Sequence, residues 1–519
     1  MSISTSEVTT DKPAIVGVVE TLSHKSTSAA HIETVASNII NQHQENASFR
    51  LTDLSSVCNQ YDLWLRELES VEPFYAVKAN PDKVIIRILA ALGCGFDVAS
   101  QGEIELVRTE LEDLHQHGVF KVDVVSNPSL GIESRVASNM IFANPCKQHA
   151  HIEHALQHGV RMMTFDCENE LHKIAAAAKR NSVQANGVHE KSAQLLLRIS
   201  TDDDTAMCSF SNKFGCAPGT NALELVDIAA TLNLDLIGVC FHVGSGCAHA
   251  GAYTTALKHS LDIFKYCESK YSDKFSMSVL DIGGGFPGDE DYGTQAGQHL
   301  PSFTELASVI RHGLANFPKN IRIIAEPGRF FSSAATTVCT RVFGCKSVEA
   351  STTTTSSSSS SSSSSRRQQQ SLTVDDGVYG TFNNILYDHY VATPSLMAAC
   401  RVDNQAATLQ DNVPEKNEAV LTTAIFGPTC DGLDELVSIN RNFCMPPCLD
   451  GDWLLWRNMG AYTHTASFSF NGLTHVPRNH YIASCPESMQ PCGKSNTGKN
   501  LNMREGSHKV LSIPALRWP

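Results

Sequence analysis

Residues 73–114 read PFYAVKANPDKVIIRILAALGCGFDVASQGEIELVRTELEDL, and they contain one pattern twice. Two short apolar runs, PFYAVKAN and CGFDVAS, are each followed at once by a segment with helical spacing of its apolar residues. A run that is apolar throughout predicts a strand buried on both faces, as in a parallel sheet covered by helices. The stretch therefore predicts two consecutive strand–helix units.

The same alternation continues to about residue 329. Six more apolar runs follow in order: MIFANP, RMMTFD, QLLLRIS, LDLIGVCFHVG, MSVLDIGGG and RIIAEPGR. Helical segments separate them, among them KQHAHIEHALQHG, ENELHKIAAAAKR and FTELASVIRHGLANF. Eight such units in about 270 residues favour an α/β fold with a closed (β/α)8 TIM-like barrel. The pattern alone leaves an open, doubly wound sheet as the alternative.

After about Ala335 the pattern changes to short strands separated by turns. Examples are TVCTRVFGCKSV, SLTVDDGVYG, AVLTTAIFG, GDWLLWRN and HYIAS. They predict a mostly antiparallel C-terminal β domain, a sandwich or a barrel, to which AIVGVVETL near the N-terminus adds a strand. We expect the (β/α)8 barrel over residues 53–335 and the β domain over 13–52 and 336–482.

Three polar segments have too few apolar residues to form a packed core. They are residues 1–12, the Ser/Thr/Gln-rich insertion STTTTSSSSSSSSSSRRQQQ at 351–370, and the tail 483–519. Such segments cannot offset the entropy cost of ordering, so we expect them to be disordered or flexible. A further polar insertion is expected at 180–193.

The charge balance excludes some partners. Lys+Arg 40 against Asp+Glu 54 gives a formal net charge of −14, without a dense basic stripe. Nucleic acid and anionic membrane are therefore poor partners, whereas a cationic small molecule is electrostatically suitable. The 17 cysteines are scattered and odd in number, and neither a signal peptide nor a long apolar span is evident, so we expect reduced thiols in the cytoplasm.

Polar residues gather at the carboxyl ends of the predicted barrel strands, where barrel enzymes place their catalytic groups. These residues are Lys78, Asp97, Asn144, Asp166, Arg198, His242, Gly283, Gly284, Gly285, Glu326 and Arg329. A lysine there suits a Schiff base, a glycine run suits a phosphate, and a carboxylate can keep a ring nitrogen protonated. Each residue has an ordinary structural explanation when taken alone. Together they predict a pyridoxal 5'-phosphate site, with no metal.

The motifs FYAVKAN, GFDVASQGE, FHVGSGC, LDIGGGFPG, AEPGRFF, YDH, FGPTCDGLD and MGAYT resemble the eukaryotic ornithine decarboxylases. This family belongs to the alanine-racemase-like, fold type III pyridoxal-phosphate enzymes. The resemblance runs in order from about residue 50 to 482. It implies decarboxylation of L-ornithine to putrescine, the committed step of polyamine synthesis. It also implies a head-to-tail homodimer with shared active sites and an antizyme-type regulatory partner.

The resemblance also implies roles for single residues of the barrel. Lys78 would carry the cofactor, Glu326 would face its pyridine nitrogen, and His242 would stack on its ring. Asp97 and Arg198 would belong to the same network. The phosphate would be held by a group of residues after the later strands: Ser245, Gly283, Gly284, Gly285, Arg329 and, from the β domain, Tyr462.

The remaining implied roles fall in the β domain. Cys430 of the facing subunit would position or protonate the substrate carbon. Asp388 and, across the interface, Asp431 would contact the distal amine of the substrate. Tyr387 would also bind the substrate, and Phe470 would line the pocket. Without the resemblance, Cys430 would be read as a structural thiol and the two aspartates as cap or turn residues.

Two alternatives remain open at this point. One is a related enzyme, namely an arginine, lysine or diaminopimelate decarboxylase or an amino-acid racemase. The other is a catalytically silent ornithine decarboxylase-like protein that binds a regulatory partner. The residues that match the active pattern, from Lys78 to Asp431, favour an active enzyme, but pocket depth and hence substrate length cannot be read from the sequence.

Overall fold

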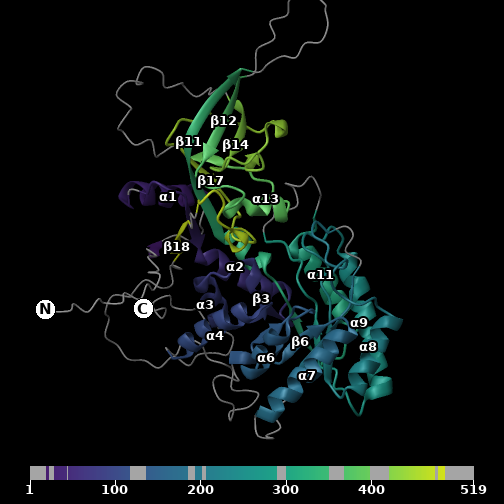
Figure 1. Ribbon diagram of the computed structural model, residues 1–519. Helices are drawn as coiled ribbons and strands as arrows, with labels where there is room; N and C mark the ends of the chain where they lie inside the picture. Colours follow the sequence, from purple (N-terminus) through teal and green to yellow (C-terminus); the bar gives the residue numbers. More distant parts are fainter. Residues whose placement is uncertain are drawn as a thin grey trace, which may run out of the picture.

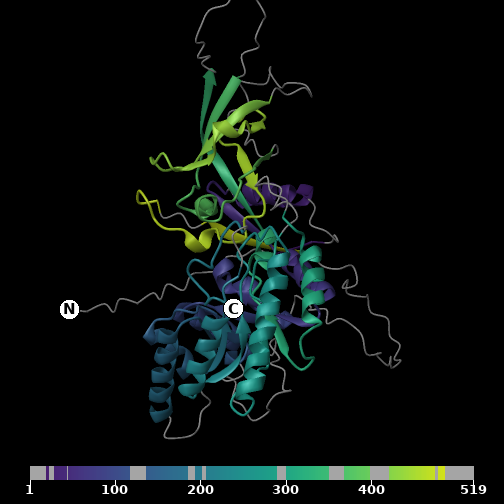
Figure 2. The same ribbon diagram turned by 90° about the vertical axis from the view of Figure 1, so that its right-hand side faces the viewer.

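The computed structural model describes residues 19–22, 29–43, 45–116, 136–184, 193–201, 206–288, 300–349, 368–397, 420–473 and 477–484. The expected disordered N-terminus and almost all of the tail lie outside these ranges. Two units are evident, a barrel and a β domain that sits at one end of it (Figures 1 and 2). None of the helices in these ranges is long and apolar enough to cross a lipid bilayer.

The barrel is a closed ring of eight parallel strands. They are β3 (Val71–Ala76), β4 (Gly95–Val98), β5 (Met140–Phe142), β6 (Met162–Phe165), β7 (Gln194–Arg198), β8 (Asp235–Cys240), β9 (Val279–Asp281) and β10 (Arg322–Ala325). Strand β10 pairs with both β9 and β3 and so closes the ring. The predicted (β/α)8 barrel is therefore confirmed, and the open sheet is excluded.

Helices cover the outside of this ring (Figure 1). They are α2 (Leu54–Glu67), α3 (Lys83–Leu92), α4 (Gln101–Gln116), α6 (His149–Gln157), α7 (Glu168–Gln184), α8 (Thr220–Thr231), α9 (Gly251–Tyr271), α11 (Phe303–Leu314) and the short α12 (Arg329–Ser332). Local sequence sets their ends. Asp82 accepts the backbone N–H groups of Val84 and Ile85 at the start of α3, and Gly93 ends that helix with φ of 99°.

The barrel is packed inside and outside with apolar side chains. Residues such as Phe74, Ile141, Leu196 and Ile324 fill the interior, while a larger cluster lies between strands and helices. Trp64 of α2 is fully buried there, and its indole N–H donates to the Val71 carbonyl oxygen at 2.8 Å. A packed interior leaves the strand ends as the place for polar chemistry.

The β domain contains one ten-stranded, mostly antiparallel sheet. Its strands are β1 (Val19–Leu22), β2 (Phe49–Asp53), β11 (Thr336–Glu349), β12 (Gln368–Val374), β13 (Ser395–Met397), β14 (Leu421–Phe426), β15 (Glu435–Val437), β16 (Cys444–Met445), β17 (Trp453–Trp456) and β18 (Arg478–Ser484). Strand β1 pairs in parallel with β18, which places the expected N-terminal strand in this sheet. Helix α1 (Ala29–His43) joins β1 and β2 and was not expected.

One expected boundary is wrong. The disordered insertion was expected to include Gln370, but β12 begins at Gln368 and pairs with both β11 and β14. The side chain of Gln370 is buried and donates to Thr423 Oγ1 at 2.9 Å and to the Pro446 carbonyl oxygen at 3.0 Å. Its own amide oxygen accepts the Cys448 N–H at 3.0 Å. These hydrogen bonds compensate for the burial of the polar Gln370 side chain, which the composition of the segment predicts to be exposed to solvent.

The two units meet beside the barrel mouth. The backbone N–H of Tyr462 donates to the Ala79 carbonyl oxygen at 2.8 Å, and Asn80 Nδ2 donates to the Gly460 carbonyl oxygen at 2.8 Å. Gly460 approaches the barrel so closely that a Cβ there would lie 1.7 Å from the Ser332 carbonyl oxygen. The junction therefore places residues of the β domain at the carboxyl ends of the barrel strands.

Candidate active site

A cavity of about 480 Å³ opens at the carboxyl ends of the barrel strands, between the barrel and the β domain. Lys78 lines it from the single turn η1 (Val77–Ala79) that directly follows β3. Other residues surround the Lys78 side chain on most sides. Because the side chain borders the open cavity, 42% of its surface is exposed. The site thus presents a primary amine to anything that enters.

Asp97 of β4 holds that amine in place. Its Oδ2 lies 3.0 Å from Lys78 Nζ, and its side chain is only 1% exposed. Burial lowers the pKa of Lys78, but the nearby charges of Asp97, Tyr462 and Glu326 outweigh it and raise the pKa above its ordinary value. Asp97 Oδ1 has no hydrogen-bond partner within the described part of the chain, so this oxygen can still accept a hydrogen bond.

A second buried carboxyl group, Glu326, lies next to Lys78. It follows β10 directly, and its backbone N–H donates to the Gly283 carbonyl oxygen at 2.7 Å. Burial, followed by the charges of Asp281 and Asp97, raises the pKa of Glu326 well above its usual range. Burial also raises the pKa of Asp281, the last residue of β9, to about 7. Two neighbouring carboxyl groups that cannot both ionise at low cost favour a cationic partner in the cavity.

His242 is held as a neutral ring. It follows β8, and its Nδ1 accepts the Gly244 N–H at 3.0 Å. Burial and the positive charges of Arg198 and Lys78 lower its pKa well below the ordinary value. Arg198, at the end of β7, lies over the Phe214 ring at 5.2 Å. Phe210 meets the His242 ring edge-on at a centroid distance of 4.9 Å. The imidazole therefore presents a fixed, uncharged face.

The glycine run after β9 makes a backbone surface without side chains. Gly283 and Gly285 have φ of 65° and 104°, which residues with side chains rarely adopt. A Cβ on Gly283 would lie 2.1 Å from the Phe241 carbonyl oxygen, and one on Gly284 would lie 2.7 Å from His242 Nε2. Only glycine fits at these positions, and backbone groups thereby come within reach of a ligand in the cavity.

Arg329 supplies the positive charge beside this run. Its Nη2 donates to Ser245 Oγ at 3.1 Å and to Asp388 Oδ1 at 2.6 Å. The side chains of Arg329 and Asp388 are 7% and 8% exposed, so the ion pair is buried. The guanidinium also lies over the Tyr462 ring at 5.0 Å. Asp388 thus shares its charge with Arg329, which the motif YDH does not reveal.

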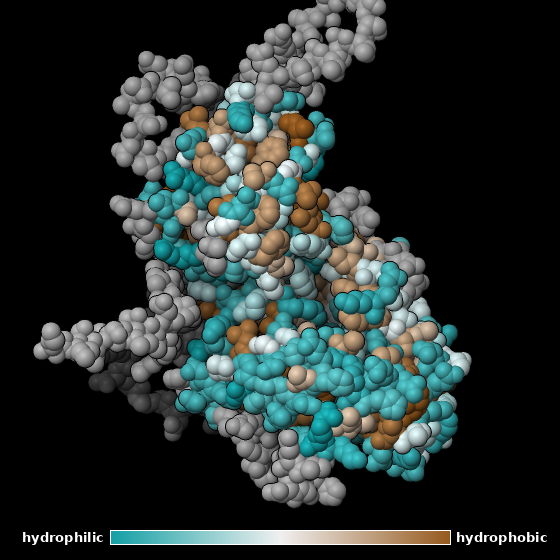
Figure 3. Space-filling view, viewed as in Figure 1, coloured by the Kyte–Doolittle hydropathy of each residue, from teal (hydrophilic) through white to brown (hydrophobic). Residues whose placement is uncertain are grey.

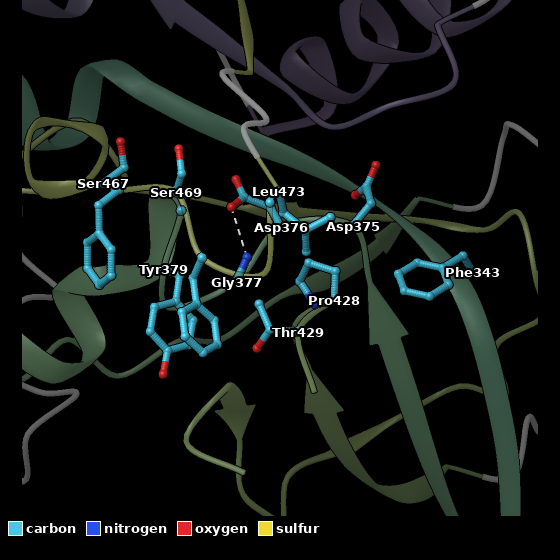
Figure 4. A pocket seen from close by; sticks show the side chains of 14 residues that line it. Phe343, Asp375, Asp376, Gly377, Tyr379, Pro428, Thr429, Ser467, Ser469 and Leu473 are labelled. Atoms are coloured by element: carbon cyan, nitrogen blue, oxygen red, sulfur yellow. Dashed lines mark hydrogen bonds between the residues drawn. The ribbon is translucent and has the colours of Figure 1, made fainter. Parts of the chain in front are cut away.

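A second cavity of about 480 Å³ lies in the β domain of the same chain (Figure 4). Tyr379 and Phe470 both line it, and their rings stack at a centroid distance of 4.3 Å. The Tyr379 hydroxyl donates to Asp431 Oδ2, which lowers the pKa of that carboxyl. Cys430 is exposed, and its Sγ accepts from Asn471 Nδ2 at 3.2 Å.

The structure thus separates the predicted site residues into two groups. One group surrounds the Lys78 cavity: Lys78, Asp97, Arg198, His242, Ser245, Gly283, Gly284, Gly285, Glu326, Arg329, Tyr387, Asp388 and Tyr462. The other group, Cys430, Asp431 and Phe470, does not line that cavity. Of the other strand-end residues, Asn144 lines the cavity, whereas Asp166 accepts the Gly215 N–H at 2.9 Å.

Sequence reasoning missed several residues of the cavity. Phe210, Phe214, Cys208 and Asn383 line it, and Asp281 lies beside Glu326. Asp281 stands in the quoted motif LDIGGG, so its position before the glycine run was a usable signal. Phe210 and Cys208 belong to a loop with no strand-end position to mark them.

The residues present fit pyridoxal phosphate. The cavity contains an amine for the aldehyde, a buried carboxyl group for a ring nitrogen, and a neutral imidazole beside it. It also contains a glycine surface that any Cβ would fill, next to Arg329 and Ser245, which suits a phosphate. These are the groups by which proteins hold this cofactor.

Comparisons with known proteins agree with this chemistry. Residues 54–333 match the family model described as pyridoxal-dependent decarboxylase, pyridoxal binding domain. Ornithine decarboxylase of Mus musculus is 38% identical over 452 residues, which cover 86% of this chain and 83% of that protein. Antizyme inhibitor 2 of Xenopus laevis is 37% identical over 443 residues, which cover 85% and 82%.

A solved structure is also similar to this chain. The lysine/ornithine decarboxylase of Vibrio vulnificus, complexed with putrescine, has a TM-score of 0.65 and 27% sequence identity. The match covers 88% of this chain and 98% of that one. The similarity therefore includes both the barrel and the β domain.

Proposed function

Because the chain belongs to the family of pyridoxal-dependent decarboxylases, we propose that it converts L-ornithine to putrescine and CO2. The chain is a pyridoxal-phosphate-dependent carboxy-lyase that acts on a basic amino acid. Ornithine is the finer part of the proposal. The Lys78 amine and the Asp388 carboxylate in one cavity support a basic substrate, and the 38% identity with ornithine decarboxylases supports ornithine.

The barrel residues would hold the cofactor as follows. Lys78 would bind its aldehyde, Glu326 would face its ring nitrogen, and His242 would lie against its ring. Gly283, Gly284, Gly285, Ser245, Arg329 and Tyr462 would hold its phosphate. Bound pyridoxal phosphate supplies an electron sink for the electrons that the departing CO2 leaves on the substrate.

The side chains of this chain would then manage protons and orientation. Asp97 is placed to hold or return a proton at Lys78 Nζ, from which it lies 3.0 Å away. The raised pKa values of Glu326 and Asp281 mean that a negative charge there lacks a cationic partner, which a protonated ring nitrogen would supply. The neutral His242 adds a flat contact without opposing that charge.

Asp388 would set the preference for a distal ammonium group. Arg329 pairs with it at 2.6 Å, so a bound phosphate would be a second anion for the same guanidinium. A phosphate held by Arg329 and Ser245 would take up part of the guanidinium charge and leave Asp388 for the substrate. A substrate without the ammonium leaves a buried carboxylate unpaired, at a cost of about 3–5 kcal/mol, or about two to four decades in rate.

The second group of residues would complete the site from a neighbouring copy. Cys430, Asp431 and Phe470 lie outside the Lys78 cavity of their own chain, which supports a homodimer with shared active sites. In that arrangement Cys430 would protonate or position the substrate carbon, and Asp431 would join Asp388 at the distal amine. An antizyme-type regulator belongs to the same proposal. The cytoplasm remains the expected compartment, because the cysteines are scattered and odd in number.

A silent, partner-binding protein is the second candidate, because antizyme inhibitor 2 is 37% identical to this chain. The two candidates differ in catalysis, and the complete Lys78 cavity supports the enzyme. A related preference for lysine or arginine is the third possibility.

One assay distinguishes these readings. CO2 release is measured in parallel from L-ornithine, L-lysine, L-arginine and L-norvaline, which lacks the distal amine, with and without added pyridoxal phosphate. We expect ornithine to be turned over fastest and norvaline about 100-fold or more slowly. Lys78→Ala should lose both the visible absorbance of bound cofactor and nearly all activity. Lys83→Ala, whose exposed side chain pairs with Glu110 on the outer wall, is the matched control.

Each contrary outcome has a clear meaning. Faster turnover of lysine or arginine would replace ornithine as the substrate. No CO2 from any substrate, despite bound cofactor, would favour the partner-binding candidate. Full activity of Lys78→Ala would contradict the assigned role of Lys78.

A further inference from the structure

Two histidines and a glutamate meet on the outer wall of the barrel, away from the cavity. His154 and His158 lie one turn apart, His154 within α6 and His158 at its C-terminal cap. Glu105 comes from α4, which packs against α6. Figures 1 and 3 show α4 and α6 on a face of the barrel covered mostly by hydrophilic residues.

The three side chains point their ligand atoms at a common point. His154 Nε2 lies 2.8 Å from Glu105 Oε1, and His158 Nε2 lies 3.6 Å from the same oxygen. All three ligand atoms lie within 4.8 Å of one another. Ligand atoms bound to a tetrahedral zinc ion at 2.0–2.1 Å stand roughly 3.3 Å apart. The observed spacings bracket that value, so small side-chain rotations suffice to bind an ion.

The contact between His154 and Glu105 is short but is not a directed hydrogen bond. Nε2 of His154 has no hydrogen-bond partner among the described residues, although it lies 2.8 Å from the carboxylate oxygen. The two imidazole rings are tilted by 50° with centroids 4.4 Å apart. A simple ion pair needs one imidazole with its N–H aimed at the oxygen. Two imidazoles and a carboxylate around one point are the ligands that Zn²⁺ prefers.

A neighbouring side chain orients the carboxylate ligand. Arg108 Nη2 donates to Glu105 Oε2 at 2.7 Å, which leaves Oε1 on the side of the histidines. Arg108 is itself balanced by Glu112, whose Oε1 lies 2.8 Å from Nη1. An oriented outer partner of a carboxylate ligand is typical of metal sites.

We propose that Glu105, His154 and His158 form a binding site for a divalent transition-metal ion, best suited to Zn²⁺, that ties α4 to α6. The three protein ligands leave a fourth position for water. Helix α4 follows β4, which contains Asp97, and α6 follows β5, so the ion would join two neighbouring units of the barrel wall. The proposal does not depend on the reaction in the cavity.

The test is a zinc titration of the cofactor-loaded full chain against a chromophoric chelator, repeated with Co²⁺ to record ligand-field absorption. The parent protein is compared with H154A/H158A and with Glu105→Gln, which keeps the size of the side chain. His172→Ala is the matched control, because His172 lies 3.4 Å from Glu168 on α7 without a second imidazole. Zinc that binds to other histidines and cysteines of the chain contributes to every titration. The site is therefore measured by the difference in zinc stoichiometry and affinity between the parent protein and each variant.

We expect one more zinc ion per chain in the parent protein and in His172→Ala than in H154A/H158A. For Glu105→Gln we expect an affinity lower by about 100-fold or more, because even outer partners of metal ligands account for about 10–100-fold. The melting temperature should rise with zinc in the parent protein and less in H154A/H158A. Equal stoichiometry and affinity in the parent protein, H154A/H158A and Glu105→Gln would overturn the proposal. CO2 release without zinc should be unchanged in all variants, which separates this result from failure of the proposed function.

Discussion

Three carboxyl groups, Asp97, Asp281 and Glu326, influence one another beneath Lys78. Asp281 Oδ1 accepts the Gly283 N–H at 2.9 Å, so the same residue supports the glycine run and faces Glu326. Burial, followed by the charge of Asp97, raises the pKa of Asp281, and burial, followed by the charges of Asp281 and Asp97, raises the pKa of Glu326. Both groups therefore bind protons in the folded protein at pH values where the unfolded chain has released them.

This gives a prediction for Asp281→Asn. Because the pKa of Asp281 is raised from 3.8 to about 7, the folded state binds more protons than the unfolded state between these pH values. The free energy of unfolding of the cofactor-free chain therefore falls as the pH rises from about 4 to about 7. Asp281→Asn removes this loss and also lowers the pKa of Glu326 towards its usual range, so its stability should depend less on pH. Urea unfolding at several pH values measures how the free energy of unfolding changes with pH in the parent protein and in Asp281→Asn.

Asp376→Asn is the comparison variant for this experiment. Burial raises the pKa of Asp376 in the β domain to about 6, and its Oδ1 accepts the N–H groups of Gly377 and Thr381, which an asparagine oxygen can replace. Asp376→Asn should therefore change the pH dependence of the free energy of unfolding only below about pH 6, whereas Asp281→Asn should change it up to about pH 7. Identical pH slopes for the parent protein and Asp281→Asn would contradict the raised pKa of Asp281.

At the scale of single residues, the sequence predicted the groups that stand directly at strand ends. Lys78, His242 and Glu326 each follow a strand within two residues, so periodicity alone places them at the barrel mouth. Asp281, the neighbour of Glu326, was not predicted as a site residue, because strand pairing brings the two together. Asp281 of β9 lies opposite Ile324 of β10, and Ile324 comes two residues before Glu326. A single sequence does not contain that register.

At the scale of elements, both close backbone contacts and side-chain contacts such as the Arg329–Asp388 ion pair join the barrel and the β domain. The Gly460 N–H of the β domain donates to the Ser333 carbonyl oxygen of the barrel unit at 3.0 Å. Tyr462 and Asn80 add the contacts on the barrel side. The junction therefore sets the position of Tyr462 relative to Lys78.

Gly460→Ala should destabilise this junction. The added Cβ would lie 1.7 Å from the Ser332 carbonyl oxygen, so the two units must separate. Overpacking of this kind costs about 1–3 kcal/mol, and Tyr462 should shift enough to weaken cofactor binding. Chemical denaturation and the pyridoxal phosphate content of the purified protein measure the two effects. Gly251→Ala, at a position with nothing within 4 Å of the added Cβ, is the control and should be near neutral.

The sequence predicted the helices and strands of the barrel, where the strand–helix pattern repeats. It did not predict elements whose formation depends on contacts with distant parts of the chain. Each barrel strand was recognised because it is apolar on both faces and is followed by helical spacing. Helix α1 and the start of β12 were missed. In β12, a glutamine run looks like part of a solvated tract, yet the buried side chain of Gln370 has three hydrogen-bond partners on other strands and loops.

At the scale of the whole molecule, the two cavities of one chain hold complementary halves of the proposed site. The Lys78 cavity has the groups for the cofactor, and the β domain cavity lies beside Asp431 and includes Phe470. Exposed apolar side chains such as Leu433 and Phe468 surround the second group. Apolar exposure of this kind is typical of surfaces that bind another protein.

Subunit mixing tests the shared site. Lys78→Ala and Cys430→Ala protomers should each be nearly inactive when pure. After random exchange half of the dimers are mixed, and each mixed dimer has one intact site of two, so about a quarter of the parent activity should return. Light scattering verifies the dimer, and differently tagged protomers verify the exchange. Verified mixed dimers without recovered activity would place Cys430 outside a shared site.

The glycine run has a consequence at the level of the gene. Every first- or second-base change in a glycine codon replaces glycine or ends the chain, whereas third-base changes are silent. A Cβ at Gly283, Gly284 or Gly285 would approach a neighbouring atom to 2.1, 2.7 or 2.6 Å, respectively. Alleles that encode a functional protein should therefore differ in these three codons only at the third base, which makes this short stretch of DNA a sensitive indicator of whether an inherited copy is still under selection.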